Sequence, residues 1–228
     1  MLEPTIQQRS AFKDIQGTFA LVQFLAIKDP GAFDHYRSAS ERTVQKAGGQ
    51  RTHCVHIDQV LAGGEMGYQA ITVDLFPSHE AALKAFDAAS AERQAALSNI
   101  YALVIRPARL LPRIARVLGF LAPLLIRMLG TASEREITGF AELTNLDNGP
   151  VPETIAVLKE HDQTTPFYMM NLNKYYPSAQ YNNGEHTSGE QAYNRYATRI
   201  APYLISVGGY PDIIGNILCV FVGDQPPA

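Results

Sequence analysis

The order of strand-like and helix-like patterns in residues 17–106 is the strongest constraint on the fold of this chain. An apolar run of strand length, FALVQFLAI, comes first. Asp29 and Pro30 then have the residue types of a helix N-cap and a first helical position, and the glycine pair at 48–49 ends that helix. A predicted hairpin, a second helix with Ser78 as N-cap, and a last strand follow. This β-α-β-β-α-β order is that of the split βαβ motif, so we expect a ferredoxin-like α+β unit.

The predicted strands are apolar or alternating runs, and the predicted helices have apolar residues at helical spacing. The strands are predicted at residues 19–27, 50–61, 68–76 and 101–106, and the helices at residues 30–47 and 79–96. The loop AGGEMG joins the second and third strands as a hairpin.

The C-terminal part of the chain repeats the first half of this order. Phe33 and Tyr36 recur as Tyr193 and Tyr196, and the glycine pair at 48–49 also recurs, all at an offset of 160 residues. The strand sequence FALVQF matches FYMMNL at an offset of 148, which leaves an insertion between strand and helix. Because the helix residues and the glycine pair recur at the same offset, we expect a tandem repeat. The alternative is chance similarity between two amphipathic helices.

These patterns divide the chain into four parts. They are an N-terminal extension at 1–16, the ferredoxin-like unit at 17–106, a helical connector at 107–165 and a partial second unit at 166–228. The second unit stops where its hairpin loop is expected, so its sheet would have an open edge. We expect a truncated product; the alternative is a partner subunit that completes this sheet.

The chain resembles family 1330 of the domains of unknown function in three consecutive runs. These runs are FALVQFLAIKDPGAFDHYRSASERTVQKAGGQ, HIDQVLAG and VDLFPSHEAALKAF. The phrases PFYMMNLNKYY and SGEQAYNRYATRIAPYLISVGGYP resemble a second copy in a tandem member. The chain departs from the family at Leu75, where an acidic residue is expected before Phe-Pro-Ser, and in its incomplete second copy.

The resemblance implies a dimeric α/β-barrel, in which two ferredoxin-like units join their sheets around a central pocket. The barrel would be a homodimer or an intramolecular pseudo-dimer. That superfamily includes cofactor-free monooxygenases, lactone isomerases and haem enzymes, so the resemblance identifies no single reaction.

Charge and cysteine content exclude several classes of protein. The chain has 19 Lys and Arg against 22 Asp and Glu, a net charge of -3, so we expect no nucleic-acid partner. Its two cysteines, Cys54 and Cys219, exclude a disulfide scaffold and fit a reducing compartment. The opening MLEPTIQQRSAFKDIQ lacks the apolar core of a secretory signal. We therefore expect a cytoplasmic protein.

Strand parity selects the side chains that would line the barrel, since alternate residues of a strand point to opposite faces. Gln23 and Asn171 hold equivalent positions in the first strands of the two units, and Asn173 follows two residues later. His56 and Asn216 are equivalent in the second strands, whose other parity is more apolar. We therefore expect these five side chains to line the pocket, on the sheet face opposite the helices.

The predicted hairpin adds a carboxylate to this set. If its turn is centred near Glu65, His56 lies opposite Asp74, and ferredoxin-like strand order brings Gln23 close to Asp74. A carboxylate beside an imidazole raises the imidazole pKa and orients the ring, so His56 and Asp74 are the candidate catalytic residues for general base chemistry. The alternative is a polar pair with a structural role in a partly buried sheet.

No metal or cofactor site is expected from the sequence. His53 and His56 are three residues apart on a strand, which points them to opposite faces, and no third ligand is near them in the chain. No glycine motif for phosphate binding follows a strand.

Segment 108–129 combines apolar residues at helical spacing with four arginines. Its uncharged core, residues 117–126, is too short to span a bilayer. Three interpretations remain open: a lid or interdomain helix, a helix for self-association, or a helix that lies weakly on an anionic membrane surface.

The leading functional hypothesis is a small-molecule pocket without a tightly held cofactor. Its chemistry would be proton transfer on, or oxygenation of, an apolar molecule with a polar edge. The alternative is a non-catalytic ligand-binding or assembly protein whose barrel is filled by side chains. A cavity of several hundred cubic ångströms lined by His56 and Asp74 would favour the first hypothesis, and a packed interior the second.

Overall fold

The computed structural model describes residues 1–58, 60, 67–108, 114, 116–117, 120–121, 167–179, 186–206 and 209–223. The chain forms two compact units. The first includes Met1–Pro107 and the strand segment that starts at Gly215. The second includes the described residues between Ala108 and Ile214.

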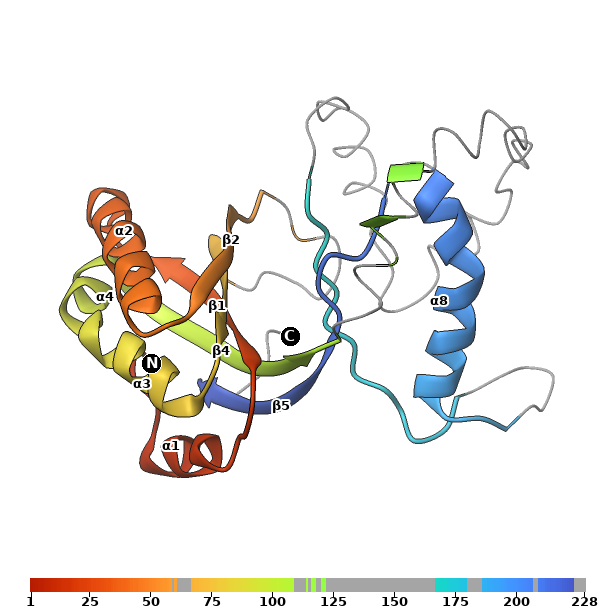
Figure 1. The fold of residues 1–228 in the computed structure, drawn as a ribbon, viewed down its shortest axis with the longest axis horizontal. Coiled ribbons are helices and arrows are strands. Elements are labelled where there is room, and N and C mark those ends of the chain that lie inside the picture. Colours follow the sequence, from red (N-terminus) through yellow and green to blue (C-terminus); the bar gives the residue numbers. More distant parts are fainter. Residues whose placement is uncertain are drawn as a thin grey trace. The chain divides into compact units, whose positions relative to one another are not determined.

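The first unit is an α+β structure with an antiparallel sheet in the order β2-β3-β1-β4-β5 (Figure 1). The strands are β1 (Phe19–Ile27), β2 (Gln50–His56), β3 (Ala70–Phe76), β4 (Leu97–Pro107) and β5 (Gly215–Val222). The helices are α1 (Ile6–Lys13), α2 (Pro30–Lys46), α3 (His79–Ala88) and α4 (Ser90–Ala96). The chain order and strand order of β1 to β4 are ferredoxin-like, which confirms the predicted fold class.

The predicted helix boundaries at α2 are confirmed. The Asp29 side chain accepts a hydrogen bond of 3.0 Å from the backbone N–H of Ala32, and Pro30 is the first helical residue. Gly48 ends the helix in the left-handed region at φ 81°, which a residue with a Cβ adopts only with strain. Gly49 lies so close to β3 that an added Cβ would be 2.8 Å from the Leu75 carbonyl oxygen.

The second predicted helix is divided into α3 and α4. Ser78 caps α3 as expected, through a 3.3 Å bond from the Ala81 N–H. In a continuous helix the Phe86 carbonyl would accept from the N–H of Ser90. It accepts instead from the guanidinium of Arg93 at 2.6 Å and from the N–H of Ala89 at 3.4 Å, so the helix is interrupted there.

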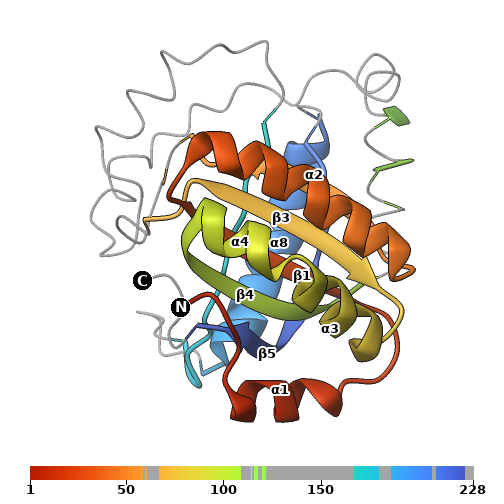
Figure 2. The same ribbon diagram turned by 90° about the vertical axis from the view of Figure 1, so that its left-hand side faces the viewer.

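The three helices α2, α3 and α4 lie together on one face of the sheet, which we call the helix face (Figure 2). The core on this face contains apolar residues of β1 and β3 together with residues of the helices. It includes Phe19, Leu21, Leu25, Phe33, Tyr36, Val44, Phe76 and Phe86. The intervening residues of the strands form the opposite face, which we call the second face. Register places there Ala20, Val22, Phe24, Ile71, Val73, Tyr101, Leu103, Ile105 and Ile217.

The N-terminal extension carries α1 and belongs to the core of the first unit. Thr5 and Gln8 form a capping box at its start, a signature that the sequence contains as T-x-x-Q. Phe12 is fully buried, and its ring centroid lies 5.3 Å from that of Phe19 and 4.6 Å from that of Phe221. The N-terminal extension therefore packs against both β1 and β5.

The predicted partial second unit at 166–228 is wrong in its strands. Its last strand, β5, pairs with β4 of the first unit, where it satisfies the hydrogen-bonding groups of an edge that β4 would otherwise expose. Residues 167–174 form no strand and lie exposed. The predicted helix is present as α8 (Gly189–Ser206), but Tyr196 is exposed where its counterpart Tyr36 is buried.

The predicted connector at 107–165 lies almost entirely outside the described residues. Pro107 is the last residue of β4, and the described positions after Ala108, which are 114, 116, 117, 120 and 121, are helical and exposed. Arg116 forms an ion pair with Asp212, and its guanidinium lies 6.0 Å from the ring centroid of Tyr210. Among the described helices, none has the length and apolar character needed to cross a bilayer. The three interpretations of segment 108–129 stay predictions.

The packing of α1 gives a direct test of this arrangement. Phe12→Ala should lower the free energy of unfolding by about 3–5 kcal/mol, because it opens a cavity among buried aromatic rings. Ile6→Ala on the same helix is the matched control, since Ile6 is 90% exposed and its loss should change stability by less than about 0.5 kcal/mol. Urea unfolding of both variants measures the difference, and equal effects would contradict the docking of α1.

Candidate functional site

A buried ion pair between Arg51 and Asp74 is the centre of the polar residues in the first unit. The two residues lie opposite each other on β2 and β3. Arg51 donates from Nε to Asp74 Oδ1 at 2.8 Å and from Nη2 to Asp74 Oδ2 at 3.0 Å. The side chains are 6% and 1% exposed. This two-point geometry is the strongest form of an arginine–carboxylate pair.

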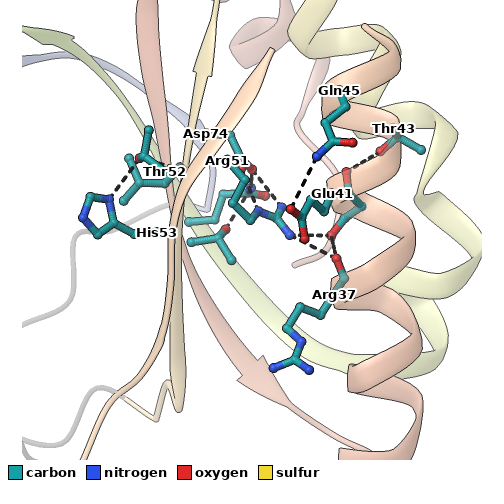
Figure 3. A network of polar contacts seen from close by, with 12 residues as sticks. Arg37, Glu41, Thr43, Gln45, Arg51, Thr52, His53 and Asp74 are labelled. Atoms are coloured by element: carbon teal, nitrogen blue, oxygen red, sulfur yellow. Dashed lines mark hydrogen bonds and ion pairs between the residues drawn. The ribbon is translucent and has the colours of Figure 1, made fainter. Parts of the chain in front are cut away.

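The remaining donor of Arg51 ties the sheet to α2 (Figure 3). Its Nη1 donates to the Ser40 hydroxyl at 3.0 Å and to the Arg37 carbonyl at 3.1 Å. Ser40 donates in turn to the same carbonyl at 3.0 Å. Arg51 therefore crosslinks β2, β3 and α2 beneath the helix layer.

The expected proximity of Gln23 and Asp74 is confirmed, but the expected face is wrong. Gln23 Nε2 donates to Asp74 Oδ2 at 3.1 Å and to the Thr72 hydroxyl at 3.2 Å. Both side chains lie on the helix face, in contact with the core under α2, and not on the face opposite the helices. Polar character along β1 did not distinguish the two faces, because both faces are buried there.

The predicted pairing of His56 with Asp74 is wrong. Ala70 lies opposite His56, and Arg51 lies opposite Asp74. The register differs from a hairpin centred at Glu65, and it shifts between Arg51 and His53. His56 is exposed at the end of β2, with its ring centroid 6.0 Å from that of Phe33. Asp74 is therefore not beside His56 and does not support its predicted role as a general base.

The asparagines expected to line the pocket do not join Gln23. On β5, the residue level with Gln23 across β4 is Val222, whereas Asn216 lies opposite Arg106 and is exposed. Asn171 and Asn173 are exposed in a segment without strand structure. Strand parity, which selected them, therefore does not apply to these two residues.

His53 points away from α2, to the second face of the sheet (Figure 3). Its Nδ1 lies 3.0 Å from the Thr52 hydroxyl. Within the described part of the chain, no three His, Cys, Asp or Glu side chains gather as a metal site would require.

Sequence reasoning missed Arg93, the largest fully buried side chain of the described residues. Its guanidinium carbon lies 3.6 Å from the ring centroid of Phe86, and its nitrogens bond Glu3 and the carbonyls of Leu2 and Phe86. A charged residue on an amphipathic helix is normally assigned to the solvent side. The acceptors that make its burial possible come from a distant part of the chain, so no local signal could reveal it.

Burial dominates the electrostatics of this network. It raises the pKa of Asp74 above its usual value, and the guanidinium of Arg51 and the amide of Gln23 oppose that rise. Burial also raises the pKa of Tyr36 to about 12, against the influence of Arg93 and Arg51. Tyr36 is therefore a neutral phenol at every physiological pH.

The cavity beside this network is small. Its volume is about 20 Å³, and its lining includes Gln23, Tyr36, Ser40, Arg51, Asp74 and Arg93 together with apolar residues of α3. That is room for about one water molecule. Asp74 is held as the partner of a permanent cation, and no imidazole belongs to the lining. The arrangement can position secondary structure, but it gives a substrate no access to an acid–base pair.

Comparison with known proteins adds little to this geometry. No protein-family model matches the chain, and no curated protein matches it. Among solved structures, the RPA0582 protein of Rhodopseudomonas palustris, a protein of unknown function, is similar at 17% identity and a TM-score of 0.42. The match covers 47% of this chain and 97% of that one. A methylated form of RPA0582 is similar at 17% identity and a TM-score of 0.42, over 48% and 96% of the two chains.

The ion pair can be tested by removing one partner or both. Asp74→Leu alone and Arg51→Met alone should each lower the free energy of unfolding by about 3–5 kcal/mol, because each leaves a buried charge uncompensated. The double substitution should cost less than the sum of the two. Arg37→Met is the control, since it breaks an exposed ion pair with Asp34 and should cost at most about 1 kcal/mol. Additive losses in urea unfolding would contradict the coupling.

The phenol of Tyr36 predicts a loss of stability at high pH. The unfolded state releases this proton near pH 10 and the folded state near pH 12, so stability from Tyr36 is complete below pH 10 and falls as the pH rises to 12. The loss should reach roughly 2–3 kcal/mol. Chemical unfolding at several pH values should therefore show a shallower decline for Tyr36→Phe than for the wild type, and parallel declines would contradict it.

Proposed function

We propose that this protein works by binding rather than by catalysis, and that the second face of its sheet is the surface that it uses. The observation that carries this proposal is the position of Asp74. The carboxylate expected to activate a histidine is on the helix face, buried, and bonded to Arg51 through both oxygens. Proton transfer or oxygenation by the predicted His56–Asp74 pair thus lacks support from the geometry.

The second face is suited to an apolar partner. Its central positions, among them Val22, Phe24, Val73 and Leu103, are aliphatic or aromatic and are buried in the full chain. Its β5 end is different, because Ile217 is 48% exposed there. Covering an apolar sheet face with another apolar surface is favourable, by about 25 cal/mol for each square ångström of apolar area removed from water.

The partner that fits best is another protein surface. The central side chains of this face are already buried in the full chain, so an intramolecular pseudo-dimer would cover them, whereas a homodimer would use the exposed β5 end around Ile217. The protein would then be an assembly protein with a packed interior. We place this function in the cytoplasm, which the free thiols of Cys54 and Cys219 support.

A small apolar molecule with a polar edge is the second candidate, favoured by a cluster at one end of this face. The ring centroid of Phe24 lies 6.0 Å from that of Tyr68 and 6.1 Å from that of Tyr101. Asn99 donates to the Tyr68 hydroxyl at 3.3 Å. Aromatic surface with an amide and a phenol at its rim is a common form of ligand contact.

Two neighbouring residues on β5 test the assembly proposal. Ile217 lies on the second face and Asn216 on the helix face, and both are exposed. Ile217→Lys should weaken a homodimer by more than about tenfold, because it places a charge against an apolar surface in both copies. In a pseudo-dimer it should instead lower the free energy of unfolding. Asn216→Lys should do neither.

Sedimentation equilibrium and urea unfolding together distinguish these outcomes. If Ile217→Lys and Asn216→Lys behave alike in both measurements, the second face is not a packing surface. The proposal would then be wrong.

A further inference from the structure

One buried polar atom of the first unit has no protein partner. Gln23 is 4% exposed, and its Oε1 has no hydrogen-bond donor within reach among the residues that the structure describes. The orientation of its amide is fixed by its neighbours. Nε2 must face Asp74 Oδ2, because turning Oε1 towards that carboxylate would place two acceptors against each other. Oε1 is therefore held as an acceptor inside the core.

The cavity under α2 adjoins Gln23. Gln23 lines it, together with the phenol-bearing Tyr36 and the small side chains of Ala82, Ala85 and Ala89. Its volume of about 20 Å³ exceeds the roughly 10–15 Å³ that one water molecule requires. The alanines create this space where larger aliphatic residues would close it.

Five other polar side chains of the lining already have hydrogen-bond partners: Ser40, Thr43, Arg51, Asp74 and Arg93. Asp74 accepts from Arg51 and Gln23, and the Ser40 hydroxyl accepts from Arg51 and donates to the Arg37 carbonyl. The Thr43 hydroxyl donates to the Ser40 carbonyl at 2.8 Å. Gln23 Oε1 is the acceptor that still needs a hydrogen-bond donor.

The chemistry of the lining selects the ligand. An anion such as chloride has no proton to donate to Gln23 Oε1. A metal cation would lie close to the guanidinium groups of Arg51 and Arg93, which line the same cavity. A neutral molecule that donates and accepts, and that fits this volume, is water.

We propose that this cavity holds one buried water molecule, which donates a hydrogen bond to Gln23 Oε1 and bonds the Tyr36 hydroxyl. The water joins β1 to α2 and keeps the Gln23 amide in place against Asp74. It is thus a positioning ligand of the Arg51–Asp74 network, independent of the proposed use of the second face.

A crystal structure of the full chain at about 1.5 Å resolution tests the site directly, since ordered waters and their partners are then defined. We expect a single peak about 2.7–3.2 Å from Gln23 Oε1, and its loss in Gln23→Met, which keeps the length of the side chain without the acceptor. An empty cavity, or a protein donor on Oε1, would overturn the proposal.

A double-mutant cycle provides a second readout in solution. Gln23→Met and Tyr36→Phe should each lower the folding equilibrium constant by roughly tenfold, and together by clearly less than the product, because the same water is lost once. The control is Gln23→Met with Tyr68→Phe, which removes a phenol hydroxyl on the other side of the sheet, and these two losses should multiply. If the Gln23 and Tyr36 losses also multiply, no water couples the two residues.

Water exchange measured by NMR keeps the test independent of whether Gln23→Met folds. In the wild type, the side-chain amide protons of Gln23 should show cross-relaxation with a long-lived water, and Tyr36→Phe should weaken that signal. Its absence in the wild type would also overturn the proposal.

Discussion

The arrangement of the first unit depends on the burial of β1. This strand lies between β3 and β4, and eight of its nine residues are buried, on both faces. A strand of that kind can only be central, since an edge position or a solvent-facing side would leave apolar surface in water. The helices must then cover one face, and the neighbouring strands must pair on both edges. Ferredoxin-like order is one of the few arrangements that satisfies these conditions with short connections.

The buried position of β1 also explains the character of the polar network. Gln23 is a polar residue in the middle of this strand, and a polar group buried there requires hydrogen-bond partners. Thr72 and Asp74 on β3 provide them, and Arg51 on β2 compensates the charge of Asp74. Breaking such a pair is costly, whereas a complete pair adds little net stability. The network therefore specifies the register of three strands and the position of α2 more than it stabilises the fold.

Both ends of the described first unit meet at the edge beside β4. The Gln8 side chain donates to the carbonyl of Gly223 at 2.6 Å, and Phe12 packs on Phe221. A fifth strand and an N-terminal helix thus extend the ferredoxin-like core on the same side. This extension covers the edge of β4 and not the second face of the sheet, whose central side chains are buried in the full chain.

The local elements of the fold follow directly from the residue types along the chain. The caps at Asp29 and Ser78, the glycine at 48 and the apolar run of β1 depend on contacts within a few residues, so their residue types predict them. The strand register, the partner of β5 and the burial of Arg93 depend instead on contacts between distant segments. The register that pairs Asp74 with Arg51 instead of His56 depends on a bulge and a loop, and one shift in register changes every cross-strand pair. Likewise, β5 resembles a strand of a second unit, yet it pairs with β4, because a free edge is satisfied by whichever strand the fold brings to it. Burial of Arg93 requires acceptors more than eighty residues away, on Leu2 and Glu3. Local sequence patterns do not predict such partners, because the contacts form only when distant segments of the chain pack together.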